Sequence, residues 1–359
     1  MNASAAVSPA TFREWTYTEE WQKQIQATRQ DETQCMQALC WNKDRNLLWG
    51  CTKSGELCLW NVPKKNEQDV APERLRPIWR CRFPGSLRGL KLAPQTQRLV
   101  IAGSEGLWVL DSSESIPSKS KSTTIPEKTV RLKTYPSAWA TPTVTETCIV
   151  GPDENTVLGV ARPDDFGVYQ WDISTCSITS TKPPSRQGVR ITTLDYCYHD
   201  DENASLCQGD SDGSVTLWDA NSHELKTSFS LAQNLPVEYV RFISPEWLVA
   251  VYNDKSGGRP SSLLVTWHIS THSMAARASV QAKIQSMRVF GDKVWIGAND
   301  GYVSIFTALD LQLQRRIAVA ASPSVHAIEV SDTLIAVAGL GSKVEIWDTD
   351  CLLCHRLSL

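Results

Sequence analysis

Hydrophobic and polar residues alternate in short runs along most of the chain, and the runs are separated by turn-forming sequences. The clearest example is LCQGDSDGSVTLWD, residues Leu206 to Asp219. Asp210 to Gly213 supply turn chemistry, because glycine accepts a positive φ and short polar side chains bond to nearby amides. Ser214 to Trp218 then alternate with the period of two that is typical of a strand in a sheet. The segment therefore predicts two adjoining strands and the tight turn between them.

The same pattern, a turn with glycine followed by an alternating run that ends on a large residue, recurs along the chain. The large residues that end these runs are Trp60, Leu110, Trp171, Trp218, Trp267, Phe306 and Trp347. Consecutive members lie roughly 40 to 60 residues apart, close to the ~40–45 residues of one four-stranded propeller blade. With its Trp-Asp endings, the pattern resembles that of WD-repeat β-propellers. We therefore expect an all-β fold, a seven-bladed WD-repeat-like β-propeller over residues 32–359.

A short amphipathic helix is expected before the first blade. Residues 1–15 are mostly small and polar and are expected to be disordered, whereas Thr16 and Glu19 have the spacing of a capping box that starts a helix over residues 16–31. Its apolar positions include Trp21 and Ile25 on one narrow stripe. This stripe either packs on the propeller beside the first blade or binds a partner protein, so Trp21 and Ile25 are candidate partner-binding residues.

Two polar segments lack any periodicity and are expected to be loops. The first is residues 63–77, PKKNEQDVAPERLRP, after which a second blade would begin at Ile78. The second, residues 111–142, is long, rich in Ser, Thr, Lys and Pro, and locally basic. Its basic residues are Lys119, Lys121, Lys128, Arg131 and Lys133. They form either an ordinary solvated surface or a binding surface for an acidic protein or an RNA backbone.

The end of the chain bears on how the ring closes. Cys351 to Ser358 follow Trp347-Asp348 at the position where earlier blades have their outermost strand. We therefore expect all four strands of the last blade to come from the C-terminal segment. Closure of the ring would then rest on side-chain packing between the last and first blades, without a shared strand.

Composition narrows the function class. The net charge of −3 predicts no bulk attraction to nucleic acid or to an anionic membrane. No apolar run approaches the ~18 residues of a membrane span and no signal peptide is recognisable, so a soluble intracellular protein is expected. The eleven cysteines are expected to be reduced, with most packed in strands. Cys351 and Cys354 form a lone C-x-x-C that lacks the second ligand pair of a zinc site.

The chain shows no catalytic signature. Its six histidines are scattered, and His268 and His272, four residues apart, straddle a predicted strand end rather than lie on a helix. No nucleophile elbow, phosphate-binding glycine loop or zinc ligand set is recognisable. We expect no enzyme activity, no cofactor, no metal and no small-molecule substrate.

The order of elements also resembles the THO complex subunit 6 family. The resemblance rests on the capped N-terminal helix, the element from Trp139 to Pro142, the WLVAVYND and LLVTWHIS strands, the stretch from Val280 to Phe306, and the last blade VAVAGLGSKVEIWD. It implies a non-catalytic scaffold in the nucleus, bound to other protein subunits of the THO/TREX assembly in mRNA processing and export. No direct sequence-specific nucleic acid binding and no membrane binding are expected.

Two alternatives of other classes remain open. Some WD-repeat proteins are substrate receptors of cullin-type ubiquitin ligases and carry an arginine two positions after Trp-Asp. Here Asn221 and Asp350 occupy that position, which argues against this role. A direct RNA-binding module is the other alternative, and a chain that is acidic apart from one basic loop does not favour it.

Overall fold

The computed structural model describes residues 35–63, 73–93, 95–112, 130–132, 143–150, 154–162, 168–175, 177–182, 189–198, 204–222, 224–231, 235–254, 260–319, 323–340 and 343–358. Every structural statement below concerns these residues. The expected helix of residues 16–31 and the expected disordered segment 1–15 lie outside them.

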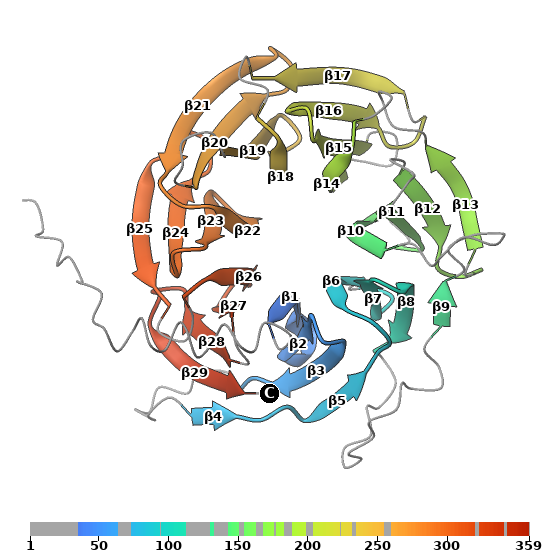
Figure 1. Ribbon diagram of the computed structural model, residues 1–359, viewed down its shortest axis with the longest axis vertical. Coiled ribbons are helices and arrows are strands. Elements are labelled where there is room, and N and C mark those ends of the chain that lie inside the picture. Colours follow the sequence, from blue (N-terminus) through green and yellow to red (C-terminus); the bar gives the residue numbers. More distant parts are fainter. Residues whose placement is uncertain are drawn as a thin grey trace, which may run out of the picture.

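Within the described residues, the strands form seven sheets arranged as a ring around a central axis (Figure 1). Each sheet is antiparallel, with its first strand nearest the axis and its last at the rim, apart from one added parallel strand described below. The first three sheets consist of β1 (Met36–Asn42), β2 (Leu47–Thr52), β3 (Glu56–Asn61) and β5 (Trp79–Arg82); β6 (Leu87–Ala93), β7 (Arg98–Gly103), β8 (Gly106–Asp111) and β9 (Val130–Leu132); and β10 (Thr143–Val150), β11 (Thr156–Arg162), β12 (Val168–Asp172) and β13 (Ser177–Lys182). The all-β propeller expected from the repeat pattern is confirmed.

The remaining four sheets follow in chain order around the ring. They consist of β14 (Ile191–Tyr198), β15 (Ala204–Asp210), β16 (Ser214–Asp219) and β17 (Leu225–Ser230); β18 (Val237–Ser244), β19 (Trp247–Asp254), β20 (Ser261–His268) and β21 (Ser273–Val280); β22 (Ile284–Phe290), β23 (Lys293–Ala298), β24 (Tyr302–Thr307) and β25 (Leu313–Ala318); and β26 (Val325–Val330), β27 (Leu334–Gly339), β28 (Lys343–Asp348), β29 (Leu353–Ser358) and β4 (Glu73–Leu75). One turn of 3-10 helix, Lys43–Arg45, is the sole helical element of the described residues. None of their helices is long and apolar enough to cross a membrane.

The sequence repeat corresponds to the third strand of each sheet. All seven large residues that end an alternating run lie at or near the end of such a strand, and six of them are buried, the exception being the half-buried Trp218. The described turn glycines at the start of these strands adopt the expected positive φ, for example Gly213 at 91° and Gly301 at 79°. Local turn chemistry and alternation therefore place the third strand of every sheet correctly.

Glycine has a second role where neighbouring sheets touch. Gly209 of β15 and Gly297 of β23 occupy equivalent places, each beneath the first valine of the next sheet. A Cβ atom on either glycine would lie 2.4 Å from a methyl carbon of Val237 or Val325. Non-bonded carbon atoms do not approach one another this closely. Glycine at these positions therefore allows the sheets to come together.

Two rim strands differ from the sequence prediction. Residues Val130–Leu132 form β9, the outermost strand of the second sheet, paired with β8. The segment 111–142 is therefore not entirely a loop. Trp79–Arg82 complete the first sheet as β5 instead of opening the second blade at Ile78. In both cases a polar insertion separates the rim strand from the third strand of its sheet. The sequence pattern therefore does not show that the two strands belong to the same sheet.

Ring closure differs in part from the expectation. The last sheet does take four strands from the C-terminal segment, and side chains of the first and last sheets share one apolar cluster that includes Trp60, Ala336 and Leu357. However, β4 from the expected loop 63–77 pairs in parallel with β29 (Figure 1). A strand encoded between β3 and β5 of the first sheet thus extends the last sheet, and closure by packing alone is wrong.

Candidate ligand and partner sites

The antiparallel order of the sheets gives the ring two different faces. The first and third strands of each sheet run in one direction and the second and fourth run in the other. The inner strands therefore all begin at one face, here called the entry face, together with the turns between second and third strands. They end at the opposite exit face, where the turns between third and fourth strands also lie. Each face carries a distinct set of side chains.

A cavity of about 490 Å³ lies in the central channel, lined by residues from the first parts of five inner strands. These strands are β1, β6, β18, β22 and β26, so the cavity lies toward the entry face. Five of its lining residues are cationic: Arg88, Lys91, Arg241, Lys283 and Arg288. Glu238 is the one carboxylate among the lining residues, and His326 adds a titratable ring. The channel is thus strongly basic in a chain whose net charge is −3.

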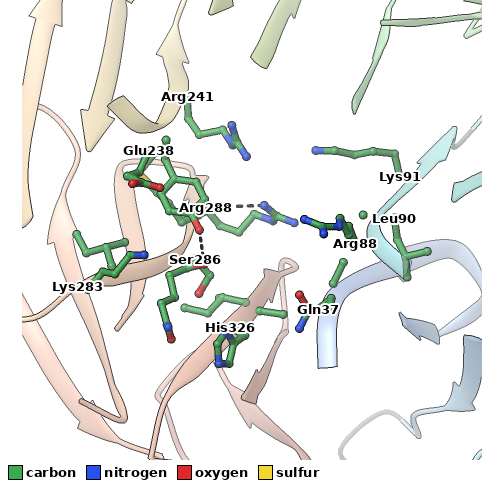
Figure 2. A pocket seen from close by; sticks show the side chains of 18 residues that line it. Gln37, Arg88, Leu90, Lys91, Glu238, Arg241, Lys283, Ser286, Arg288 and His326 are labelled. Carbon is green, nitrogen blue, oxygen red and sulfur yellow. Dashed lines mark hydrogen bonds between the residues drawn. The ribbon is translucent and has the colours of Figure 1, made fainter. Parts of the chain in front are cut away.

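The basic side chains reach the cavity from different walls. Arg88 and Lys91 project from β6, whereas Arg241 and Arg288 project from β18 and β22 on the other side, and all four point toward the middle of the channel (Figure 2). Four cations on facing strands repel one another unless an anion lies between them. The geometry therefore favours binding of a negatively charged group.

Hydrogen bonds hold two of these arginines in place. The Nη1 of Arg241 donates to the hydroxyl of Thr193 at 3.1 Å and to the backbone carbonyls of Leu194 at 3.2 Å and Val240 at 2.7 Å. The Nε of Arg288 donates to the Glu329 carboxylate at 2.7 Å, and its Nη1 donates to the backbone carbonyl of Met287 at 3.2 Å. Both guanidinium groups are therefore positioned before any ligand arrives.

Neighbouring inner strands are also tied to each other around the cavity. The Tyr239 hydroxyl of β18 donates to the backbone carbonyl of Gln285 in β22. The Ser286 hydroxyl of β22 donates to the carbonyl of Val325 in β26 at 3.3 Å, and the Ser324 hydroxyl donates to the Gln285 side chain. These links cross from sheet to sheet and make the channel wall a preorganised surface.

The exit face carries the exposed apolar residues. In the described part of the chain, the large hydrophobic side chains that are exposed are Ile78, Tyr198, Leu225, Met274, Leu309, Leu313 and Leu352, with 41–59 % of their surface accessible. All seven lie at the end of an inner strand, in a turn between third and fourth strands, or at the start of a rim strand. They therefore line one face, over five consecutive sheets from the fourth to the first. We call this set the exit-face row.

The candidate residues expected from the sequence are mostly outside the described residues. Trp21, Ile25, Lys119, Lys121, Lys128 and Lys133 all fall there. The backbone of Arg131 lies in β9 at the rim, opposite Trp108. No grouping of three or more metal-ligating side chains occurs among the described residues, and His268 bonds to its own turn through the amide and hydroxyl of Thr271.

Nothing in the sequence drew attention to the channel cations. The cations lie in three largely apolar strands that are far apart along the chain: Arg88 and Lys91 in β6, Arg241 in β18 and Arg288 in β22. The available signal was the fifth position of the first strand of a repeat, which Lys91, Arg241 and Arg288 share and which becomes visible once the repeats are aligned.

Comparison with known proteins supports the fold. No family model matches the chain. Among solved structures, it is similar to the crystal structure of the WD40 β-propeller domain of Doa1, with a TM-score of 0.64 and 14 % sequence identity, over 88 % of this chain and 93 % of that domain. The likeness shows a WD40 β-propeller fold.

Proposed function

We propose that the protein is a non-catalytic interaction scaffold with seven blades, and that it serves in the nucleus as a subunit of the THO/TREX assembly in mRNA processing and export. The observation that carries the scaffold role is the exit-face row. Large apolar side chains gathered on one face of a soluble ring are characteristic of a surface that another protein covers.

The assignment to the THO/TREX assembly rests on the resemblance to the THO complex subunit 6 family described above. The propeller fold fits this assignment, since a rigid ring can hold several subunits on its faces and rim. The partners would be other protein subunits, with the exit-face row as one contact surface. The basic residues of segment 111–142 and the stripe of Trp21 and Ile25 are further candidate contacts.

Purification of the tagged protein from its own cells tests this proposal. We expect large helical subunits of a nuclear export assembly to be recovered with the wild type, and the tagged protein to be concentrated in the nucleus. The variant Leu225→Glu/Met274→Glu/Leu313→Glu should reduce their recovery by about tenfold or more, because three charges would be buried at the interface. Its melting temperature should change little, since all three side chains are exposed.

A matched control places the same charges at the opposite ends of the same strands. The variant Ser230→Glu/Ser279→Glu/Ala318→Glu changes three exposed residues of β17, β21 and β25 near the entry face. It should retain the partners. Equal recovery with both variants would exclude the exit-face row as the contact surface, whereas recovery of a cullin-ligase adaptor in place of the export subunits would contradict the assignment to THO/TREX.

A further inference from the structure

The cationic channel is a feature that a protein-interaction scaffold does not require. Its five Lys and Arg residues come from three inner strands and the residue that precedes one of them, and they line one half-open cavity. Walls of low polarisability strengthen the repulsion between like charges and also concentrate the field that attracts an anion. Repulsion within such a cluster destabilises the protein when no ligand is bound, and a bound anion would offset this repulsion.

Neutralisation within the protein is partial. Glu329 binds Arg288, and Glu238 lies on the wall. The side chains of Arg88 and Lys91, in contrast, form no ion pair with any described carboxylate. Both extend into the channel from β6 (Figure 2). Two positive charges are thus available on one wall, opposite two arginines held in position on the other.

The chemistry of these groups points to phosphate. A guanidinium presents parallel N–H donors that match two phosphate oxygens, and an ammonium adds a compact charge. A compact molecule with several phosphates can present oxygens to the cations of both walls at once. The cavity volume of about 490 Å³ is within the range of small-molecule sites.

We propose that the central channel binds a compact soluble polyphosphate of the inositol polyphosphate class, with Arg88, Lys91, Arg241 and Arg288 as its phosphate-binding residues. Inner strands of five sheets surround the site, and hydrogen bonds between strands fix its wall. A preorganised site of this size suits a small rigid ligand better than an extended chain, because little ordering is needed on binding.

Calorimetric titration of the full chain with inositol hexakisphosphate tests the proposal. At physiological ionic strength we expect one site with a dissociation constant of about 1 µM or lower, and a melting temperature that rises by several degrees at saturation. The variant Arg88→Glu/Lys91→Glu should weaken binding by about 30-fold or more, because it replaces two phosphate ligands by repelling charges. Inorganic phosphate should bind far more weakly, since it offers one phosphoryl group to the four cations.

The control variant Arg80→Glu/Arg82→Glu makes the same change in charge on the exposed rim strand β5. It should bind inositol hexakisphosphate within about twofold of the wild type, because the rim lies beyond the ~8 Å range of unscreened charge. If Arg88→Glu/Lys91→Glu does not fold, the neutral variant Arg88→Gln/Lys91→Gln takes its place, with an expected loss of about tenfold.

Three results would overturn the proposal. The first is no heat and no thermal shift with millimolar inositol hexakisphosphate. The second is an equal loss of affinity in the channel and rim variants, which would mean unspecific attraction. The third is tighter binding of a doubly phosphorylated peptide than of inositol hexakisphosphate, which would assign the channel to a phosphorylated partner protein.

Discussion

At the residue scale, the aspartate of the Trp-Asp ending binds backbone amides of the turn that follows it. The residue after the large apolar side chain accepts a hydrogen bond from a backbone amide of the turn between the third and fourth strands. Five sheets use this arrangement, through Asp172, Asp219, His268, Thr307 and Asp348. Aspartate is thus one of several side chains that can satisfy these amides, which explains why the pattern persists where the Asp is absent.

Asp219 offers a direct test of this role. Its carboxylate accepts from the amides of Asn221 at 2.9 Å and Ser222 at 2.8 Å and pairs with Lys226 at 3.0 Å. The hydrogen bond from Ser222, followed by that from Lys226, holds the pKa of Asp219 well below its ordinary value. Asp219→Ala should therefore lower the free energy of unfolding at pH 7 by about 1 kcal/mol, measured by urea denaturation.

The pH dependence gives a second check on Asp219. A carboxyl group with a lowered folded-state pKa stabilises the protein above its unfolded-state pKa, and this contribution is lost as the pH falls toward the folded-state value. The difference between wild type and Asp219→Ala should thus shrink below about pH 4. The exposed Asp292→Ala serves as the control and should match the wild type. A similar loss in both variants would contradict the turn-binding role.

Asp210 predicts the opposite pH dependence. It is 1 % exposed, and burial raises its pKa to about 6 although the side chains of Gln208, Ser214 and Thr216 donate to it. A raised carboxyl pKa means that the folded protein gains stability as the pH falls through 6 toward 4. Between pH 8 and pH 5 this gain should be about 1 kcal/mol.

Asp210→Asn removes the titrating proton while keeping the shape of the side chain. The variant should be more stable than the wild type at pH 8, and its advantage should shrink by about 1 kcal/mol at pH 5. Denaturant unfolding at the two pH values measures this, with the exposed Asp44→Asn as the control. A pH-independent difference between wild type and Asp210→Asn would show that Asp210 does not titrate in this range.

At the element scale, the shared strand β4 is the feature with the largest consequence. Its residues pair with His355, Arg356 and Leu357 of β29, and the side chain of Leu75 packs on the apolar cluster between the first and last sheets. Backbone pairing and packing thus act at the same seam. The edge of the last sheet is covered there, as edge strands in stable proteins often are.

A proline pair tests the contribution of this strand. Successive residues of a strand direct their amides to opposite sides, so Arg74→Pro/Leu75→Pro removes at least one amide that faces β29. We expect faster amide hydrogen exchange in Leu353–Ser358, unchanged exchange in Leu313–Ala318 of β25, and a loss of about 2 kcal/mol in the free energy of unfolding. Leu75→Ala alone is the control for lost packing. If the two variants behave alike, the pairing does not contribute to closure.

At the scale of the whole molecule, the ring separates two kinds of surface. Exposed apolar residues lie on the exit face, and the basic cavity lies toward the entry face. A partner on the exit-face row and an anion in the channel could therefore be bound at the same time. The variants of each surface should leave the other intact, so Leu225→Glu/Met274→Glu/Leu313→Glu should bind inositol hexakisphosphate as the wild type does, measured by the same titration.

The sequence by itself determined the propeller, because its signals are local. Alternation over a few residues, a turn glycine with positive φ and a large residue at the strand end are all contained in one hairpin, as in Leu206 to Asp219. Repetition of that hairpin then implies a ring, since each sheet buries its faces against its neighbours.

Only the tertiary structure decided how the ring closes and which residues face the channel. β4 is three residues long and too short to show a period, and its partner β29 lies near the other end of the chain. The cations Arg88, Lys91, Arg241 and Arg288 are unremarkable in their own strands and become a site when facing strands bring them together. Both features depend on contacts between distant segments, which no local pattern encodes.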